Sequence, residues 1–133
     1  MSYSLADAIV SLVNEVRGNL PLGIADEQVS KPGAKFKTPT ADNWLRLTFS
    51  DSVPDENTPN CYFRDECFFA VDFFYAKDNG IIQLTRDVEA MRALLRNRNI
   101  GNASAFNATI KDLGEGGPWF HKQLLLTFTY EGL

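Results

Sequence analysis

His121 is the side chain of this sequence best suited to acid–base chemistry, because a histidine changes its charge between about pH 5 and 8. It is the single histidine among 133 residues. A general base needs its substrate's proton within reach, and commonly a second group that orients the imidazole ring. The neighbours of His121 in sequence, Phe120, Lys122 and Gln123, provide neither a nucleophile nor a carboxylate. The sequence therefore predicts a solvated or interfacial histidine and no catalytic residue.

The two cysteines, Cys61 and Cys67, are candidates for a disulfide or for a nucleophilic thiol. They belong to one segment with the composition of an extended strand, so about 20 Å separate them. A disulfide requires Cβ atoms about 4 Å apart. Apart from Arg64, no basic cluster or helix N-terminus lies near either thiol to activate it. Two small apolar side chains in a buried strand are the favoured interpretation.

Metal and phosphate sites are also disfavoured by the spacing of the candidate ligands. The carboxylates Asp51, Asp55 and Glu56 do not follow the pattern of a calcium loop. The arginines of residues 92–98 share a predicted helix with acidic residues, which favours a solvated face over phosphate binding. The glycine-rich segment 114–118 precedes a strand, whereas a phosphate loop precedes a helix. The sequence predicts no metal and no cofactor.

Length and composition predict one domain over residues 1–133. A chain of this size buries a core without disulfides or metals. Its apolar fraction of 44% and its charged fraction of 23% are ordinary for a globular protein. The net charge of −4 disfavours nucleic-acid binding, including sequence-specific binding, and association with an anionic membrane. Neither a membrane span nor a secretion signal is apparent, so we expect synthesis in the cytoplasm.

Hydrophobic periodicity predicts two helices and four strands in the order α-β-β-α-β-β. The first helix covers residues 5–17, and Thr85 caps the second helix. The strands cover residues 44–50, 61–78, 106–111 and 120–130. Long loops are expected at 19–42 and 51–60. These elements predict an α+β two-layer sandwich, with both helices on one face of a mostly antiparallel sheet of four or slightly more strands.

The sheet face away from the helices is the predicted interaction surface. Strand parity places on it Trp44, Arg46, Phe68, Asp72, Phe74 and Leu125. Because a monomer exposes few large apolar groups together, we infer a subunit interface. The two long loops contain candidate docking residues, namely Lys35, Phe36, Lys37, Asp55 and Glu56. For residues 19–42 a solvated loop is the favoured interpretation, and a docking arm is the alternative.

The chain resembles the tail terminator proteins of long-tailed bacteriophages, including the lambda-type minor tail protein family. The resemblance lies in the order of these segments: MSYSLADAIVSLVNEVR, TADNWLRLTFS, ECFFAVDFFYAKDNG, LTRDVEAMRALLR and KQLLLTFTYEG. It implies a structural protein without catalytic activity, which forms a homo-hexameric ring on the tail tube protein. The implied ring stops tube polymerisation, contacts the head-completion or connector protein, and resides at the head–tail junction of the virion.

Two other functions are compatible with the same features. A head–tail connector or head-completion protein of the same machine would have a small α/β subunit of similar composition. A small enzyme or ligand-binding module on a ferredoxin-like sandwich is the more distant alternative, because that architecture hosts many unrelated functions.

Overall fold

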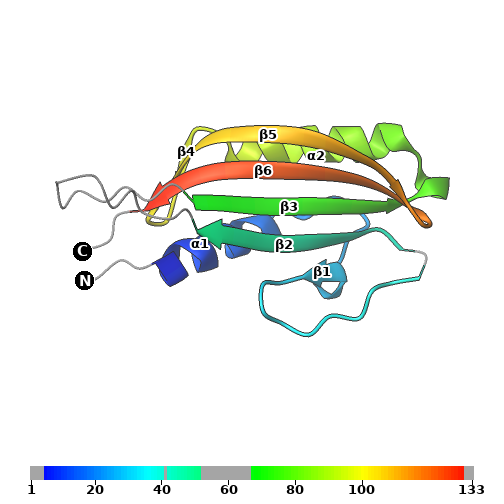
Figure 1. Cartoon of the computed structure of the whole chain (residues 1–133), viewed down its shortest axis with the longest axis horizontal. Helices are drawn as coiled ribbons and strands as arrows, with labels where there is room; N and C mark the ends of the chain where they lie inside the picture. The colour runs from blue at the N-terminus through cyan, green and yellow to red at the C-terminus, as the bar shows by residue number, and fades with distance from the viewer. Residues whose placement is uncertain (1–4, 41, 52–66, 131–133) are drawn as a thin grey trace.

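A computed structural model of the chain describes residues 5–40, 42–51 and 67–130 (Figure 1). Two α-helices, two 3-10 turns and six strands follow one another along these residues. They are α1 (Leu5–Arg17), η1 (Asp26–Gln28), β1 (Val29–Ser30), β2 (Trp44–Asp51), β3 (Cys67–Ala76), η2 (Lys77–Asn79), α2 (Ile81–Leu95), β4 (Arg98–Ile100), β5 (Ala103–Gly116) and β6 (Trp119–Tyr130). No helix among the described residues is long and apolar enough to cross a membrane.

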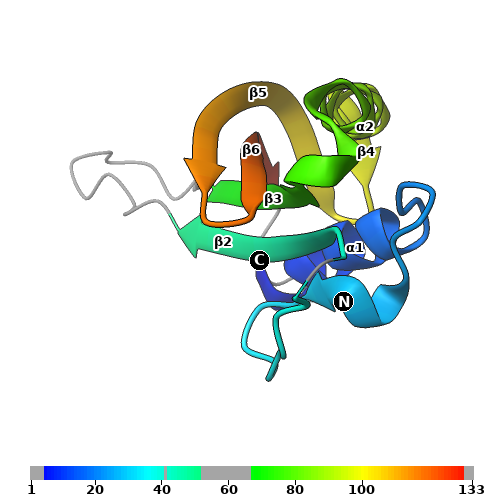
Figure 2. The ribbon, with the colours of Figure 1, turned by 90° about the vertical axis from the view of Figure 1, so that its right-hand side faces the viewer.

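All six strands form one mixed sheet in the order β1-β2-β3-β6-β5-β4. β1 runs parallel to β2, and the other neighbours are antiparallel. The sheet curls like half a barrel, and β5 arches over β6 when the sheet is seen from its end (Figure 2). Register shifts between Ala105 and Asn107 and between Asp112 and Glu115 mark two irregularities in β5. Because a bulge bends its strand, they contribute to this curvature.

The predicted fold class is therefore wrong. The sheet is not a four-stranded antiparallel layer in the order α-β-β-α-β-β, but a six-stranded, mixed and curled one. The two missed strands, β1 and β4, have two and three residues. Strands this short carry too few alternating positions for the periodicity of their side chains to reveal them.

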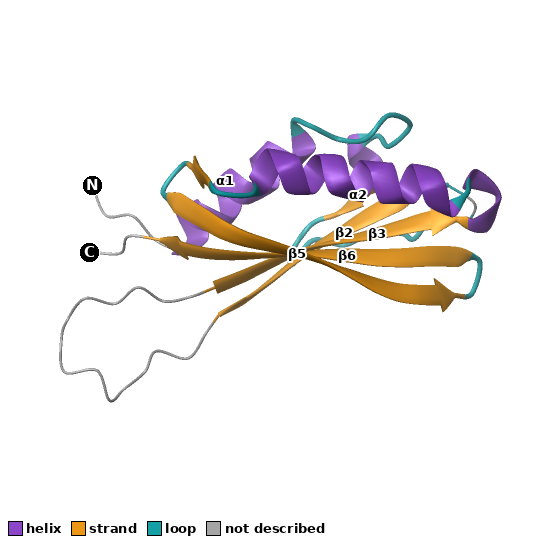
Figure 3. Cartoon of the chain, turned by 90° about the horizontal axis from the view of Figure 1, so that it is seen from above, coloured by secondary structure: helices purple, strands orange, loops and turns teal. Residues whose placement is uncertain are grey.

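The apolar core lies between the sheet and the two helices, which Figure 3 shows on the same side of the sheet. In α1 the buried residues are Ala8, Leu12 and Val16, whose spacing of four makes one apolar stripe. The predicted bounds of this helix are confirmed. The sheet contributes the alternate residues Cys67, Phe69, Val71, Phe73 and Tyr75 of β3 and Leu124, Leu126 and Phe128 of β6.

The second helix begins four residues before its predicted cap. Gly80 has φ 82°, a left-handed conformation that glycine adopts without strain, and α2 starts at Ile81 directly after it. Thr85 lies inside the helix, where its hydroxyl donates a hydrogen bond to the Ile81 carbonyl at 2.8 Å. The prediction that Thr85 caps this helix is therefore wrong.

Residues 19–40 are more structured than the predicted long loop. They include η1 and β1, and Val29 of β1 is buried in the core. At the surface, Arg17 and Lys31 both pair with Asp26, at 2.6 and 3.2 Å. The hydrogen bond from Arg17 holds the pKa of the Asp26 carboxyl below its usual range. The chain after α1 is thus tied to the helix and to the sheet. Of the other predicted loop, 51–60, Asp51 ends β2 and the rest lies outside the described residues.

Candidate functional site

A stack of aromatic rings crosses the sheet face that points away from the core. The pairing register places Trp44 of β2, Phe74 of β3 and His121 of β6 in one row. Phe74 stacks on Trp44 and on His121, with 4.1 Å between ring centroids in each pair. Phe36, from the chain before β2, extends the stack with its ring centroid 5.4 Å from that of Trp44. We call Phe36, Trp44, Phe74 and His121 the aromatic ladder.

A buried carboxylate lies beside the ladder, in the next row of the sheet. That row consists of Arg46, Asp72 and Gln123. Asp72 is 1% exposed, and it is the only buried residue with a carboxyl side chain among those described. Nε2 of His121 lies 2.7 Å from its Oδ1, and Gln123 donates to the same oxygen at 3.1 Å. These contacts supply the hydrogen bonds that a buried charge requires.

Arg46 connects the carboxylate to the ladder. Its Nε lies 3.5 Å from Oδ2 of Asp72, and its guanidinium carbon lies 5.1 Å from the centre of the Phe74 ring. The Arg46 side chain is 44% exposed, whereas Trp44 is buried. A charged group resting on an aromatic surface, with one side open to solvent, is typical of residues that anchor protein interfaces.

The Asp72–His121 pair has the form of a carboxylate that orients a histidine base. Among the described residues, Asp72 also contacts Gln123 and Arg46, and His121 also stacks on Phe74. None of these three is a nucleophile. Within the same residues, no group of three or more histidine, cysteine, aspartate or glutamate side chains is arranged to hold a metal ion. Within the described part of the chain, the geometry positions a histidine and buries a carboxylate, and it places no nucleophile beside them.

The predicted interface residues lie on one face of the sheet, but not in one cluster. Trp44, Arg46, Asp72 and Phe74 are mutual neighbours. Leu125 is paired with Ala70, and Phe68 is paired with Thr127, so both lie further along the face. Asp72 and Trp44 are already covered within one subunit. The role of these six residues as a subunit interface stays a prediction.

The predicted docking residues have mixed surroundings. Lys35 and Lys37 are exposed, and Phe36 between them is half-buried against Trp44. Asp55 and Glu56 lie outside the described residues, as does Cys61. The docking role of this loop stays a prediction, but Phe36 places the two lysines next to the aromatic ladder.

Sequence reasoning missed the contact between Asp72 and His121, which lie 49 positions apart. Alternation put both residues on the less apolar faces of their strands, and this is the one signal that could have linked them. The register between β3 and β6 decides whether the two side chains meet. A shift of one residue would have placed the His121 side chain on the face of the sheet opposite to that of Asp72. Neither strand specifies that register by itself.

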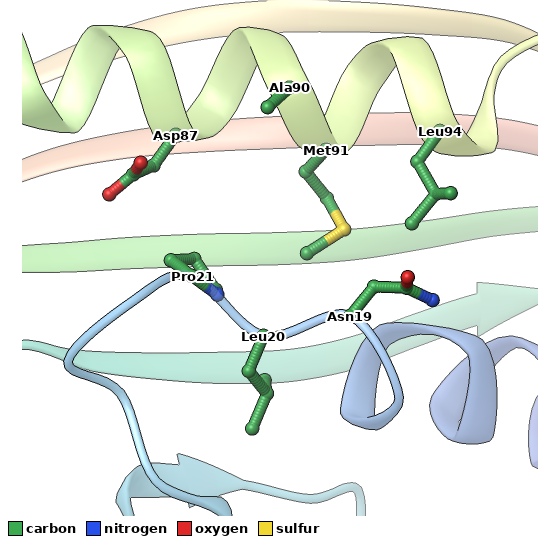
Figure 4. A pocket seen from close by; sticks show the side chains of 7 residues that line it. All are labelled: Asn19, Leu20, Pro21, Asp87, Ala90, Met91 and Leu94. Carbon is green, nitrogen blue, oxygen red and sulfur yellow. The ribbon is translucent and has the colours of Figure 1, made fainter.

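A pocket of about 290 Å³ lies on the other side of the sheet, between α2 and the chain that follows α1 (Figure 4). Its lining is mostly apolar and consists of Asn19, Leu20, Pro21, Asp87, Ala90, Met91 and Leu94. Asp87 accepts hydrogen bonds from the Tyr75 hydroxyl and from Gln83. The one charged group of the pocket is therefore engaged in holding α2 to β3.

The contact between Tyr75 and Asp87 can be tested by the pH dependence of the protein's stability. Burial of the phenol, together with its hydrogen bond to Asp87, raises the pKa of Tyr75 above its ordinary value of 10.0. A raised pKa contributes stability that is complete below about pH 10 and is lost as the pH rises further. In urea unfolding above about pH 10, we expect the wild type to lose stability more steeply than Tyr75→Phe, by at most about 1.4 kcal/mol per pH unit. Parallel curves for the two proteins would contradict the buried, protonated phenol.

Comparison with known proteins supports the fold and leaves the function open. No protein-family model matches the sequence, and no curated protein matches it. A solved structure whose name states no function is similar, with a TM-score of 0.63 and 14% sequence identity. The similarity covers 98% of this chain and 99% of that one. At this identity the likeness shows that the two chains share a fold over almost their whole lengths, and nothing further.

Proposed function

We propose that this protein is a tail terminator of a long-tailed bacteriophage, a structural subunit of a homo-hexameric ring that caps the tail tube. The observation that carries the proposal is the sheet face away from the core, where Arg46 and the aromatic ladder lie together. Arginine and aromatic side chains are enriched at the energetic centres of protein interfaces. The order of segments that resembles tail terminators over nearly the whole chain supports the same proposal.

A ring of identical subunits needs two different contact surfaces on each subunit, because a head-to-tail contact repeats around a closed axis. The ladder face is one candidate surface. The segment with Lys35 and Lys37 is exposed beside it and is a candidate for contact with the tail tube protein or the head-completion protein. The net charge of −4 fits a ring through which DNA passes without being retained.

The proposed ring has two functions. One side fits the last ring of the tube, and because its opposite side does not repeat the tube surface, polymerisation stops there. The opposite side then receives the head-completion or connector protein, which places the subunit at the head–tail junction of the virion. Both functions need protein contacts, and neither needs a catalytic residue.

The mass of the purified protein in solution tests the proposal. Light scattering over a concentration series, with and without the cognate tail tube protein, should give either a hexamer or a monomer that assembles on tube ends. Electron microscopy should then show rings capping those ends. A protein that stays monomeric at every concentration, with and without tail tubes, would rule the proposal out.

A connector of the same machine would present the same type of surface, so the partner must decide between the two. A pull-down from assembling particles should retain the tail tube protein if the chain is a terminator. Retention of the portal side alone would assign it to the connector.

The Asp72–His121 pair is the one observation that favours an enzyme. If the pair is catalytic, His121→Gln should abolish an enzymatic activity of the protein and leave the mass of the ring unchanged. If His121→Gln alters only stability or assembly, the pair is structural.

A further inference from the structure

The sheet has two long strands whose outer edges are only partly covered. β5 extends from Ala103 to Gly116, but β4 pairs with Ala103–Ala105 alone. β1 pairs only with Leu45 and Arg46 of β2. Among the described residues, the segments 47–51 of β2 and 107–116 of β5 therefore have a strand neighbour on one side only. Unpaired edges of this length are templates for pairing with another chain.

One hydrogen bond shows which backbone groups of β5 face outwards. The Ala108 carbonyl accepts a hydrogen bond from Nε of Arg92 at 3.0 Å, so its backbone points away from β6. Ile110 and Asp112 have the same parity in the strand, and their N–H and C=O groups point to the same open side. Arg92 covers the edge at Ala108, and the following residues remain available for pairing.

Apolar side chains reach the surface beside both edges. Phe49 is 42% exposed although its partner in β3, Phe69, is fully buried. It belongs to the core-facing side of β2, so the apolar layer of the core is open at this margin. On β5, Leu113 is 48% exposed. A strand added beside β2 would cover Phe49 and extend the core across the junction.

Strand direction shows which partner fits both edges. β2, β3, β6 and β5 are successive antiparallel neighbours, so β2 and β5 run in opposite directions. A second copy placed beside the first in the same orientation therefore sets its β2 antiparallel to β5. Pairing of β5 with β5 about a two-fold axis would leave both β2 edges open. A head-to-tail arrangement satisfies both edges of every subunit and closes into a ring.

We infer that the open edge of β5 pairs with the open edge of β2 in a second copy of this chain, so that the sheet continues from subunit to subunit. The inference rests on the ring-forming function proposed above and identifies the contact that closes the ring. It assigns both surfaces of the head-to-tail contact to the two margins of the sheet, in place of the ladder face. The ladder face is then left for contact with the tail tube protein or the head-completion protein.

Cysteine pairs at the two edges test the contact directly. Thr48 of β2 and Thr109 of β5 are both exposed and belong to one row of the sheet, through Ala70 and Leu125. With both native cysteines replaced by alanine, Thr48→Cys together with Thr109→Cys should oxidise to a ladder of covalent oligomers that ends at the ring size. Each single variant should stay monomeric on a non-reducing gel. Dimers from Thr109→Cys alone would show a two-fold contact and overturn the inference.

Hydrogen exchange tests the same contact without depending on its register. The amides of Ile110 and Asp112, and those of residues 47–51 that point outwards, should exchange quickly in the monomer and become protected in the ring. Protection without cross-linking supports the pairing in another register. Protection of 47–51 already in the monomer would show that the same chain covers this edge, which overturns the inference.

A charge at the edge supplies a functional test with a matched control. Thr109→Lys should raise the concentration needed for ring formation by at least about tenfold, because a charged side chain on an edge strand opposes its pairing with a second strand. Ala93→Lys adds the same charge on the exposed side of α2 and should leave ring formation unchanged. A ring that forms with unprotected edges would overturn this inference and leave the proposed function standing. If no ring forms under any condition, both fall.

Discussion

Phe73→Ala should lower the free energy of unfolding by about 3–5 kcal/mol, the largest effect that we expect from a single substitution in this chain. Phe73 is fully buried at the centre of β3, between the sheet and the helices. Removal of its ring takes away apolar contacts and leaves a cavity that the surrounding side chains fill only in part. Urea unfolding followed by circular dichroism measures the loss.

Phe106→Ala is the matched control, because the same atoms are removed from an exposed position of another strand. Phe106 is 45% exposed, since the register shift between Ala105 and Asn107 takes it out of the alternation of β5. We expect a cost below about 1 kcal/mol. Equal losses for the two variants would show that Phe106 is buried and that β5 is regular at this point.

Asp72→Ala should lower the free energy of unfolding by about 2–4 kcal/mol. The substitution removes the acceptor shared by His121 and Gln123, both part-buried, and leaves Arg46 without its carboxylate. Because Arg46 is about half-exposed, water replaces part of that interaction, and the expected cost stays below that of a fully buried ion pair. The measurement is again chemical unfolding at neutral pH.

Asp78→Ala removes the same group from an exposed position of η2 and should change stability by less than about 0.5 kcal/mol. A double-mutant cycle with His121→Ala should give a coupling energy of at least about 0.5 kcal/mol between Asp72 and His121. If Asp72→Ala is as stable as the wild type, the contacts of the Asp72 carboxylate with His121, Gln123 and Arg46 do not stabilise the fold.

The two largest effects involve residues that the sequence treats very differently. Phe73 lies in an alternating apolar run, and its place in the core follows from that run alone. Asp72 was predicted at a subunit interface because it lies on the opposite face. The structure buries it within one subunit, since His121 and Gln123 come beside it from β6. Local alternation indicates a face, and only the neighbouring strand shows what covers that face.

The sequence by itself determined the elements in which many alternating or helical positions repeat. The apolar stripe of α1 and the core faces of β3 and β6 are of this type, because burial of one face leaves a periodic record in the residues. Tertiary structure alone decided the short strands β1 and β4, the irregularities of β5 and the start of α2 at Gly80. It also decided the register that brings His121 to Asp72. The start of α2 depends on the left-handed conformation of Gly80. The short strands, the irregularities and the register depend on hydrogen bonds between segments far apart in the chain, and such bonds form between backbone groups that are the same in nearly every residue.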